Sequence, residues 1–259
     1  SYPHANFAIM IEARDLEKGF AEKTVLRRIN VVFEPGKTNL VIGKSGSGKT
    51  VLLKILAGLI EPDFGEILFE GKSVAEMSKR ERQNIQQKTG MLFQEGALFD
   101  SLSVGQNVTF PLLLHTNMSE RQAMKRALEC LERVNLDGVY NQYPGDLSGG
   151  MRKRVAIARA IANEPKFLFC DEPNSGLDPQ TGLLIDNLIH SITHDLNITT
   201  IVNTHDMNSV LGIGDHVVFL SEGYLIWEGR GSDILTTHDE ALNRFVFATP
   251  LAKKLLEKS

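Results

Sequence analysis

The sequence predicts an α/β fold built on a mostly parallel sheet with helices on both faces. Short apolar segments typical of buried strands alternate with helix-prone segments through much of the 259 residues, the order expected of parallel strands joined by crossover helices. A glycine-rich motif follows one such strand and precedes a helix, and another apolar strand ends in two carboxylates. The composition, 42% hydrophobic and 23% charged, is that of a globular protein able to bury a sizeable core.

Charge and composition also exclude several classes of protein. The net charge is −4 and the pI is near 6.0, without the basic domain of most nucleic-acid-binding proteins, so no nucleic-acid partner is expected. The two cysteines, Cys130 and Cys170, lack metal-ligand spacing and are predicted to be free thiols of a reducing compartment. No apolar run approaches the ~18 residues of a membrane span, and no charged-then-apolar leader precedes the first strand. Any work at a membrane is therefore expected to depend on partners.

The first part of the chain predicts a small antiparallel sheet. Residues 9–13 and 25–33 alternate apolar and polar side chains on either side of a turn at 19–21, a pattern typical of paired strands. The other elements predicted before residue 95 are an edge strand at 66–70, a polar helix at 78–88 and a buried strand at 90–94 that runs into Gln94.

Residues 43–50 read GKSGSGKT and match G-x-x-x-x-G-K-[ST], the phosphate-binding P-loop. A buried strand precedes this loop and a helix follows it, which is the context that the motif requires. Its glycines let successive backbone N–H groups point at an anion, and the helix N-terminus adds a positive end. Lys49 can reach the β- and γ-phosphates, and the Thr50 hydroxyl suits Mg²⁺. The loop therefore predicts nucleoside triphosphate binding by Gly43, Lys44, Ser45, Gly46, Ser47, Gly48, Lys49 and Thr50.

Residues 95–165 predict a helical insertion, because strand patterns nearly vanish there. Ser119 and Gln122 form a capping box in front of one helix, which is expected to carry Met124, Leu128 and Leu131 on one face. A second helix is expected to begin near Ser148 and end before Pro165. The β/α pattern then resumes, with strands predicted at 167–171, 198–203, 216–220 and 224–227, a helix from Asp178 to about residue 194, and a helix-prone stretch at 232–259.

Two further motifs carry candidate chemistry. The strand FLFCD delivers Asp171 and Glu172 at its C-terminal end, where ligands bind in open α/β sheets. One carboxylate suits Mg²⁺ and the other can polarise an attacking water, although such pairs are often only solvated turn residues. In LSGGM, Ser148 and the glycines at 149 and 150 form a helix start that can bind a second anion. On its own this helix start is better interpreted as an ordinary glycine-containing cap, and one nucleotide does not obviously need two such ends in one chain.

The ordered set GKSGSGKT, Gln94, LSGGM, FLFCDE, SGLD at 175–178 and His205 resembles the ATP-binding-cassette (ABC) ATPases over residues 9 to about 230. The resemblance implies a RecA-like P-loop NTPase core with an antiparallel β-subdomain and a helical insertion at about 95–165. It places the ATPase domain at 9–246 and a C-terminal tail at 247–259. In this family two cassettes dimerise head to tail and ATP lies between the P-loop of one and the LSGG helix of the other, which explains the second anion site.

The resemblance also implies a role for each matching residue, with ATP and Mg²⁺ as cofactors. Lys49 and the loop amides hold the phosphates, while Thr50 and Asp171 hold Mg²⁺. Gln94 reaches the metal and the attacking water and senses the transport partner. Glu172 is the general base and His205 contacts the γ-phosphate. The remaining implied contacts are made by Ser148, Gly149 and Gly150 to the partner's nucleotide, by Asp178 across the dimer interface and by Phe20 on the adenine.

Three features together resemble the ATPase subunits of Mla/Mce-type lipid transporters: LSGGM, the run MLFQEGALF at 91–99, and NVTFPL at 107–112. Two departures from most cassettes, Met151 for glutamine and Phe20 for tyrosine, remove no phosphate contact. The resemblance implies transport of phospholipids or other lipids between membranes, with a transmembrane permease, an Mce-type lipid-binding protein and a small regulatory subunit as partners. It places the chain in the cytoplasm, peripheral on the cytoplasmic face of a bacterial inner membrane. The apolar side chains of these runs are equally compatible with ordinary core.

Two alternative functions stay open at this point. The chain could serve another transport system, for amino acids or lipoproteins, or be a soluble cassette acting on nucleic acid. The second class typically inserts long coiled coils or carries two cassettes, whereas about a hundred residues without heptads separate Lys49 from Ser148 and one set of motifs is present.

Three weaker signals are interpreted as structural. His190 and His194 lie four apart on a predicted helix, but no third metal ligand is evident in the sequence. The basic run RKR at 152–154 predicts a solvated or interface face, and 253–258 a docking or frayed helix rather than a membrane contact.

Overall fold

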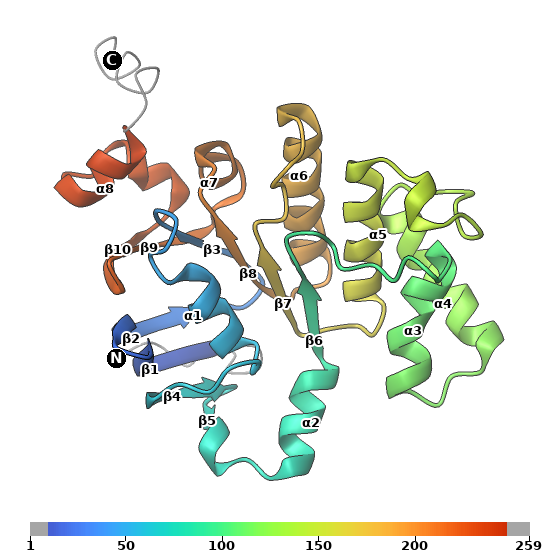
Figure 1. The fold of residues 1–259 in the computed structure, drawn as a ribbon, viewed down its shortest axis with the longest axis horizontal. Coiled ribbons are helices and arrows are strands. Elements are labelled where there is room, and N and C mark those ends of the chain that lie inside the picture. The colour runs from blue at the N-terminus through green and yellow to red at the C-terminus, as the bar shows by residue number, and fades with distance from the viewer. Residues whose placement is uncertain (1–9, 248–259) are drawn as a thin grey trace.

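The computed structural model describes residues 10–247, which form two sheets and a set of helices (Figure 1). The strands are β1 (Ile11–Phe20), β2 (Lys23–Phe33), β3 (Thr38–Ile42), β4 (Phe64–Phe69), β5 (Lys72–Ser73), β6 (Thr89–Leu92), β7 (Phe167–Asp171), β8 (Thr199–Thr204), β9 (His216–Ser221) and β10 (Tyr224–Gly229). The α-helices are α1 (Lys49–Leu56), α2 (Lys79–Gln87), α3 (Val104–His115), α4 (Glu120–Arg133), α5 (Gly149–Ile161), α6 (Pro179–Asp195), α7 (Met207–Ile213) and α8 (Glu240–Val246).

The larger sheet has the order β10-β9-β3-β8-β7-β6 and is parallel except for β10. Every residue of β3, β7 and β8 is buried, as expected of parallel strands covered on both faces. Because β8 lies between β3 and β7, the chain ends of these three strands meet at one carboxyl edge. That edge receives both the P-loop and the carboxylates of the FLFCDE motif, and the predicted α/β architecture is confirmed.

The smaller sheet is antiparallel and has the order β2-β1-β4-β5. The prediction of an edge strand at 66–70 is wrong in one respect, because β4 pairs with β1 on one side and with the two-residue strand β5 on the other. The two sheets share an apolar core with α1, in which Phe69 and Phe167 meet edge to face at 5.0 Å. Figure 1 places this sheet at the lower left and α3, α4 and α5 on the right, with the parallel sheet between them.

The helical insertion is confirmed, since no strand lies between β6 and β7 in this described part of the chain. It contains one more helix than predicted, α3, which starts at a capping box between Ser103 and Gln106. The capping box of Ser119 is also present, but of the expected apolar face of α4 only Leu131 is buried. Met124 and Leu128 are 45% and 44% exposed, whereas the buried face carries Ala123, Ala127, Cys130 and Leu131. Small side chains let α4 approach the helices packed against it, and this outweighs side-chain hydrophobicity.

The helix-prone stretch predicted at 232–259 is described by the structure only as far as residue 247. Within the stretch predicted as helix-prone, α8 is the helix that the structure describes, and the segment 253–258 lies outside the described residues. The proposed tail at 247–259 lies outside them apart from its first residue, so the division of the chain at 246 stays a prediction. Among residues 10–247, no helix is both long enough and apolar enough to cross a membrane.

Candidate nucleotide site

The P-loop connects β3, in the middle of the parallel sheet, to α1. Two of its glycines are fixed by close packing. Gly43 has φ 153°, and a Cβ there would lie 2.2 Å from the Leu220 carbonyl oxygen. Gly48 has φ 106°, and a Cβ there would lie 2.7 Å from Leu26 Cδ2. Because L side chains rarely adopt such φ values and neither space admits a carbon atom, the sequence GxxxxGK is required by this loop geometry.

Lys49 turns back into this loop. Its Nζ donates hydrogen bonds to the carbonyl oxygens of Gly43 at 2.9 Å and Lys44 at 3.1 Å, and the side chain is 6% exposed. Burial lowers the pKa of Lys49, opposed by the nearby charges of Glu172 and Asp171. Ser47 Oγ is buried in the same loop with no protein partner among the described residues. A buried cation beside an unpaired hydroxyl is the arrangement that suits a bound phosphate.

Asp171 connects the P-loop helix to β8. Its Oδ1 accepts hydrogen bonds from the Thr50 hydroxyl at 3.2 Å and from Asn203 Nδ2 at 3.1 Å. The other amide atom of Asn203, Oδ1, is buried and has no protein partner among the described residues. Mg²⁺ prefers hydroxyl and carboxylate oxygens, so the donor set of Thr50 and Asp171 fits this ion.

Glu172 follows Asp171 in a strained conformation. Its φ of 45° lies in the left-handed region, which costs a non-glycine residue roughly 1–2 kcal/mol. Its N–H donates to the Asn203 carbonyl at 3.0 Å, and its own carbonyl accepts from the Ser175 N–H at 3.1 Å. These bonds hold the carboxylate in place, and its Oε1 lies 3.1 Å from Nδ1 of His205. The two candidate catalytic side chains from β7 and the end of β8 therefore meet at the carboxyl edge of the sheet.

The loop after β6 is fixed to α5 by two cations. Lys153 Nζ donates to the carbonyl oxygen of Gln94, and the Arg159 guanidinium donates to the carbonyl oxygens of Gly96 at 2.7 Å and Ala97 at 2.8 Å. The Gln94 amide itself donates to Ser175 Oγ at 3.2 Å, next to the Glu172 segment. The prediction of a solvated face at 152–154 is thus wrong for Lys153, which is 6% exposed and whose pKa is lowered by burial.

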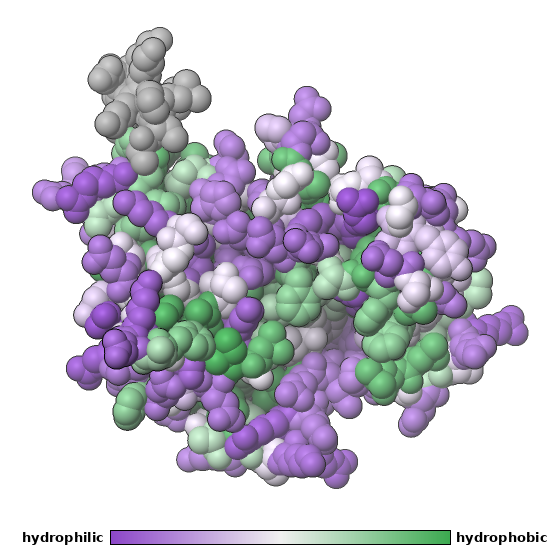
Figure 2. Space-filling view, in the orientation of Figure 1, coloured by the Kyte–Doolittle hydropathy of each residue, from purple (hydrophilic) through white to green (hydrophobic). Residues whose placement is uncertain are grey.

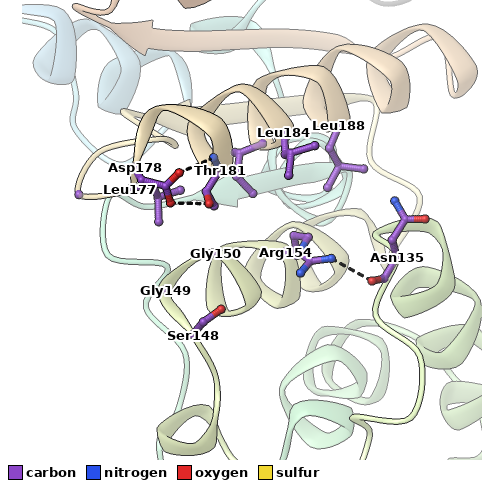
Figure 3. Close-up of a pocket in the computed structure, with 12 residues that line it drawn as sticks. Asn135, Ser148, Gly149, Gly150, Arg154, Leu177, Asp178, Thr181, Leu184 and Leu188 are labelled. Carbon is purple, nitrogen blue, oxygen red and sulfur yellow. Dashed lines mark hydrogen bonds between the residues drawn. The ribbon is translucent and has the colours of Figure 1, made fainter.

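The LSGG motif starts α5 beside the start of α6 (Figure 3). Ser148 is exposed and its Oγ accepts a hydrogen bond from the Met151 N–H at 3.3 Å as the N-cap. A Cβ on Gly150 would lie 2.5 Å from Thr181 Cγ2, so the glycine lets the ends of α5 and α6 pack together. Asp178 caps α6, and its carboxylate accepts from the Thr181 hydroxyl at 2.6 Å, a bond that lowers the pKa of Asp178.

These two helix starts border a cleft of about 410 Å³ that contains no P-loop residue. Its lining combines polar and apolar side chains from α5 and α6, as Figure 3 shows for Arg154, Leu184 and Leu188. The candidate residues therefore fall into two groups. The P-loop, Asp171, Glu172 and His205 form one connected group, and Ser148, Gly149, Gly150 and Asp178 form the other. Phe20 is the last residue of β1 and is 47% exposed.

Several residues that organise the site were not singled out from the sequence. Asn203 contacts both Asp171 and the Glu172 backbone, and Lys153 and Ser175 hold Gln94 at its two ends. Buried Asp186 accepts hydrogen bonds from Asn174 and Ser209. Ser175 and Lys153 belong to the runs SGLD and RKR named from the sequence, but their contacts with Gln94 were not predicted, and Asn203 was only the last residue of the strand predicted at 198–203.

Comparisons with known proteins agree with this geometry. The family model described as ABC transporter matches residues 26–175. The chain is 38% identical over 92% of its length to the intermembrane phospholipid transport system ATP-binding protein MlaF of Haemophilus influenzae, covering 90% of that protein. It is 35% identical to the probable ribonucleotide transport ATP-binding protein mkl of Mycobacterium leprae, covering 92% of this chain and 69% of that protein.

One solved structure is similar to the chain in both fold and sequence. It is a dimer of the ATP-binding cassette MJ0796 in a post-hydrolysis state bound to ADP and Pi, with a TM-score of 0.76 and 32% identity. The match covers 85% of this chain and 98% of that one. The chain carries the P-loop, the adjacent carboxylates and the LSGG helix start, and its fold is similar to that of this cassette. Because the family model matches more than half of the chain, the chain belongs to the ABC transporter family.

Proposed function

We propose that the chain is the ATP-hydrolysing subunit of a membrane ABC transporter that moves phospholipids between membranes. The ATPase assignment rests on the connected group at the carboxyl edge of the sheet. In this group Lys49 bonds to the P-loop, Asp171 bonds to Thr50, and Glu172 lies 3.1 Å from His205. The cargo assignment is supported by the similarity to MlaF over 90% of that protein's length and by the LSGGM motif.

In this function the P-loop amides, Lys49 and Ser47 hold the ATP phosphates. Thr50, Asp171 and the side chain of Gln94 hold Mg²⁺, which when bound neutralises charge on the phosphate oxygens. Glu172 accepts a proton from the attacking water, and His205, 3.1 Å from its carboxylate, orients it and contacts the γ-phosphate. Catalysis then consists of positioning and charge stabilisation.

The LSGG group completes the site from a second copy of the chain. Ser148, Gly149 and Gly150 line a cleft that contains no residue of their own P-loop, which supports contact with the γ-phosphate of another chain. Asp178 lies beside them at the start of α6 and spans the interface. The solved relative with 32% identity is described as dimeric, and Phe20, exposed at the end of β1, stacks on the adenine.

A permease is expected to dock on an apolar groove beside α3. Two connected hollows of about 530 and 420 Å³ share Met91, Phe93 and His115 and extend to Phe99 and Phe110. Val108 is core, but Phe99 and Phe110 are 45% and 43% exposed and their rings lie 5.1 Å apart. Figure 2 shows hydrophobic surface gathered over α3. Exposed aromatic side chains in a groove are typical of a protein interface.

Co-purification from membranes tests the transporter and its cargo together. We expect the chain to bring down a permease, an Mce-type lipid-binding protein and phospholipid, with the complex on the cytoplasmic face of the inner membrane and a small regulatory subunit among its components. Phe110→Asp is expected to abolish recovery of the permease, whereas Leu128→Asp, at a 44% exposed site on α4, retains it. Recovery with ribosomes or DNA contradicts the transporter assignment, and ATPase stimulation by ribonucleotides but not phospholipid contradicts the cargo.

A further inference from the structure

The two histidines of α6 have a third potential metal ligand that the sequence does not reveal. His190 and His194 lie one turn apart near the C-terminal end of α6, and Asp215 lies just before β9. Asp215 Oδ2 is 3.0 Å from Nε2 of His194 and 3.8 Å from Nδ1 of His190. One ligand atom from each of the three residues lies within 4.8 Å of the others. Asp215 is 21 residues beyond His194, and only the fold brings it to the pair.

We propose that His190, His194 and Asp215 form a binding site for a divalent transition-metal ion of the Zn²⁺ class. Bonds of about 2.0–2.1 Å in a tetrahedral arrangement place two ligand atoms about 3.3 Å apart. The observed separations of 3.0 and 3.8 Å from Asp215 lie on either side of this value, and the ligand nitrogens of the two histidines lie within 4.8 Å of each other. Imidazole nitrogen with carboxylate oxygen favours Zn²⁺, Co²⁺ or Ni²⁺, whereas Mg²⁺ prefers oxygen alone.

The surroundings hold the ligands in position before an ion binds. The backbone N–H of Thr38 donates to Asp215 Oδ2 at 2.8 Å, which fixes the carboxylate in the way an outer-shell hydrogen bond does. The fully buried Thr38 hydroxyl lies 3.2 Å from His190 Nδ1 and places a second oxygen, and a fourth polar atom, beside the three ligands. His194 is half-exposed, so the ion can enter from solvent and keep a water ligand.

This site is separate from the nucleotide site. Thr38 begins β3, whose other end enters the P-loop, so the cluster lies at the opposite edge of the parallel sheet. Asp178 caps the first turn of α6 and His190 lies 12 residues further along it, about 18 Å away at 1.5 Å per residue. Metal binding can therefore be measured without nucleotide, and Mg²⁺ can be present throughout.

The experiment titrates the full-length, chelator-treated protein with Co²⁺ and then Zn²⁺ in the presence of Mg²⁺ and absence of nucleotide. Visible d–d absorption reports the coordination of Co²⁺, and calorimetry gives the stoichiometry and Kd for Zn²⁺. We expect one ion per chain, with the Co²⁺ spectrum lost when Zn²⁺ displaces it. His194→Ala and Asp215→Asn should each weaken binding at least about tenfold, and His238→Ala, which removes an exposed histidine outside the cluster, should leave Kd unchanged.

A thermal readout keeps the test independent of spectroscopy. Zn²⁺ at about 100 times its Kd should raise Tm of the wild type by several degrees, roughly 5–10 °C, because it binds the folded state alone. His194→Gln, at a half-exposed position, is expected to fold normally by circular dichroism and to lose this shift. Absence of Co²⁺ or Zn²⁺ binding by the wild type overturns the proposal, as does a Kd that is the same in the wild type and in both ligand variants.

Discussion

The P-loop edge of the sheet and the LSGG end of α5 both have features that suit anion binding, yet the hydrogen bonds of their polar groups differ. At the P-loop edge, Lys49 is buried and bonded to loop carbonyls, and Asp171 is bonded to Thr50 and Asn203. At the LSGG end, Ser148 and Asp178 are exposed, and within residues 10–247 their side chains bond only inside their own helix starts. The first region is a buried network that leaves only Ser47 Oγ and Asn203 Oδ1 without a partner among its described residues. The second region is exposed surface.

This difference indicates what each region needs in order to act. A helix N-terminus in water stabilises an anion by only about 0.3–1 kcal/mol, whereas the same groups act more strongly where water is excluded. The LSGG end therefore contributes little until another surface covers it. The P-loop edge has its charges assembled in the single chain, so nucleotide binding and dimer closure are expected to be separable properties.

The largest effect is expected from Glu172→Gln. It removes the general base and leaves the phosphate cradle intact, so turnover should fall by about 10²–10⁴-fold while ATP binding is retained. The ATP-bound variant should accumulate as a dimer, because hydrolysis no longer reopens it. Steady-state ATPase assays with nucleotide-binding measurements on the same sample test this. A wild-type hydrolysis rate in Glu172→Gln shows that the base has been assigned to the wrong residue.

Lys49→Ala should instead lose affinity for ATP. Removing a buried, hydrogen-bonded charge beside a phosphate costs about 2–5 kcal/mol, or roughly 30-fold or more in Kd. Lys54→Ala on the same helix removes a lysine outside the loop and serves as the control. Equilibrium binding of a fluorescent ATP analogue measures both variants, and unchanged affinity in Lys49→Ala contradicts the phosphate cradle.

Lys153→Met tests how the two regions are connected. Lys153 lies on the helix that begins at LSGG and donates to the carbonyl of Gln94, so it joins the LSGG end to the P-loop edge. Methionine keeps the volume of the buried side chain and removes the donor. We expect kcat to fall about three- to tenfold with little change in ATP affinity, because positioning rather than binding is lost. A larger effect on KM than on kcat runs against this connection.

Asp186 is expected to have the smallest effect on turnover, because it acts on the pH dependence of stability instead. Burial raises its pKa to about 6, while hydrogen bonds from Ser209 and Asn174 oppose this, against about 4 in the unfolded chain. The folded state thus binds the proton more tightly, so this contribution to stability is full below about pH 4 and is lost as pH rises through about 6.

Asp186→Asn should remove that dependence. Its amide oxygen can still accept from Ser209 and Asn174, and its charge no longer changes with pH. Urea unfolding from about pH 4 to about pH 7 should show the wild type losing up to about 3 kcal/mol relative to the variant. Parallel stability curves for the two proteins over this range rule out a buried carboxyl with a raised pKa.

What could be predicted from the sequence was local. The P-loop glycines, the Ser119 and Ser148 caps and the carboxylates after β7 each depend on residues within a few positions, and the structure places all of them as expected. The α4 face was wrong for Met124 and Leu128 because it depends on how closely Ala123 and Ala127 approach neighbouring helices. Asn203 and Asp215 contact residues that are distant in the sequence and that lie beside them only because of the order of the strands in the sheet. No local pattern in the sequence encodes that order.

Mixing two inactive variants tests the composite site most directly. Lys49→Ala disables the P-loop, and Ser148→Asp places a carboxylate opposite the γ-phosphate while keeping a good N-cap. Each variant alone should be inactive, but a mixed dimer pairs the intact P-loop of one chain with the intact LSGG of the other. We predict that mixing equal amounts restores about a quarter of the wild-type ATPase rate per chain. A mixture as inactive as its components contradicts a site shared between two copies.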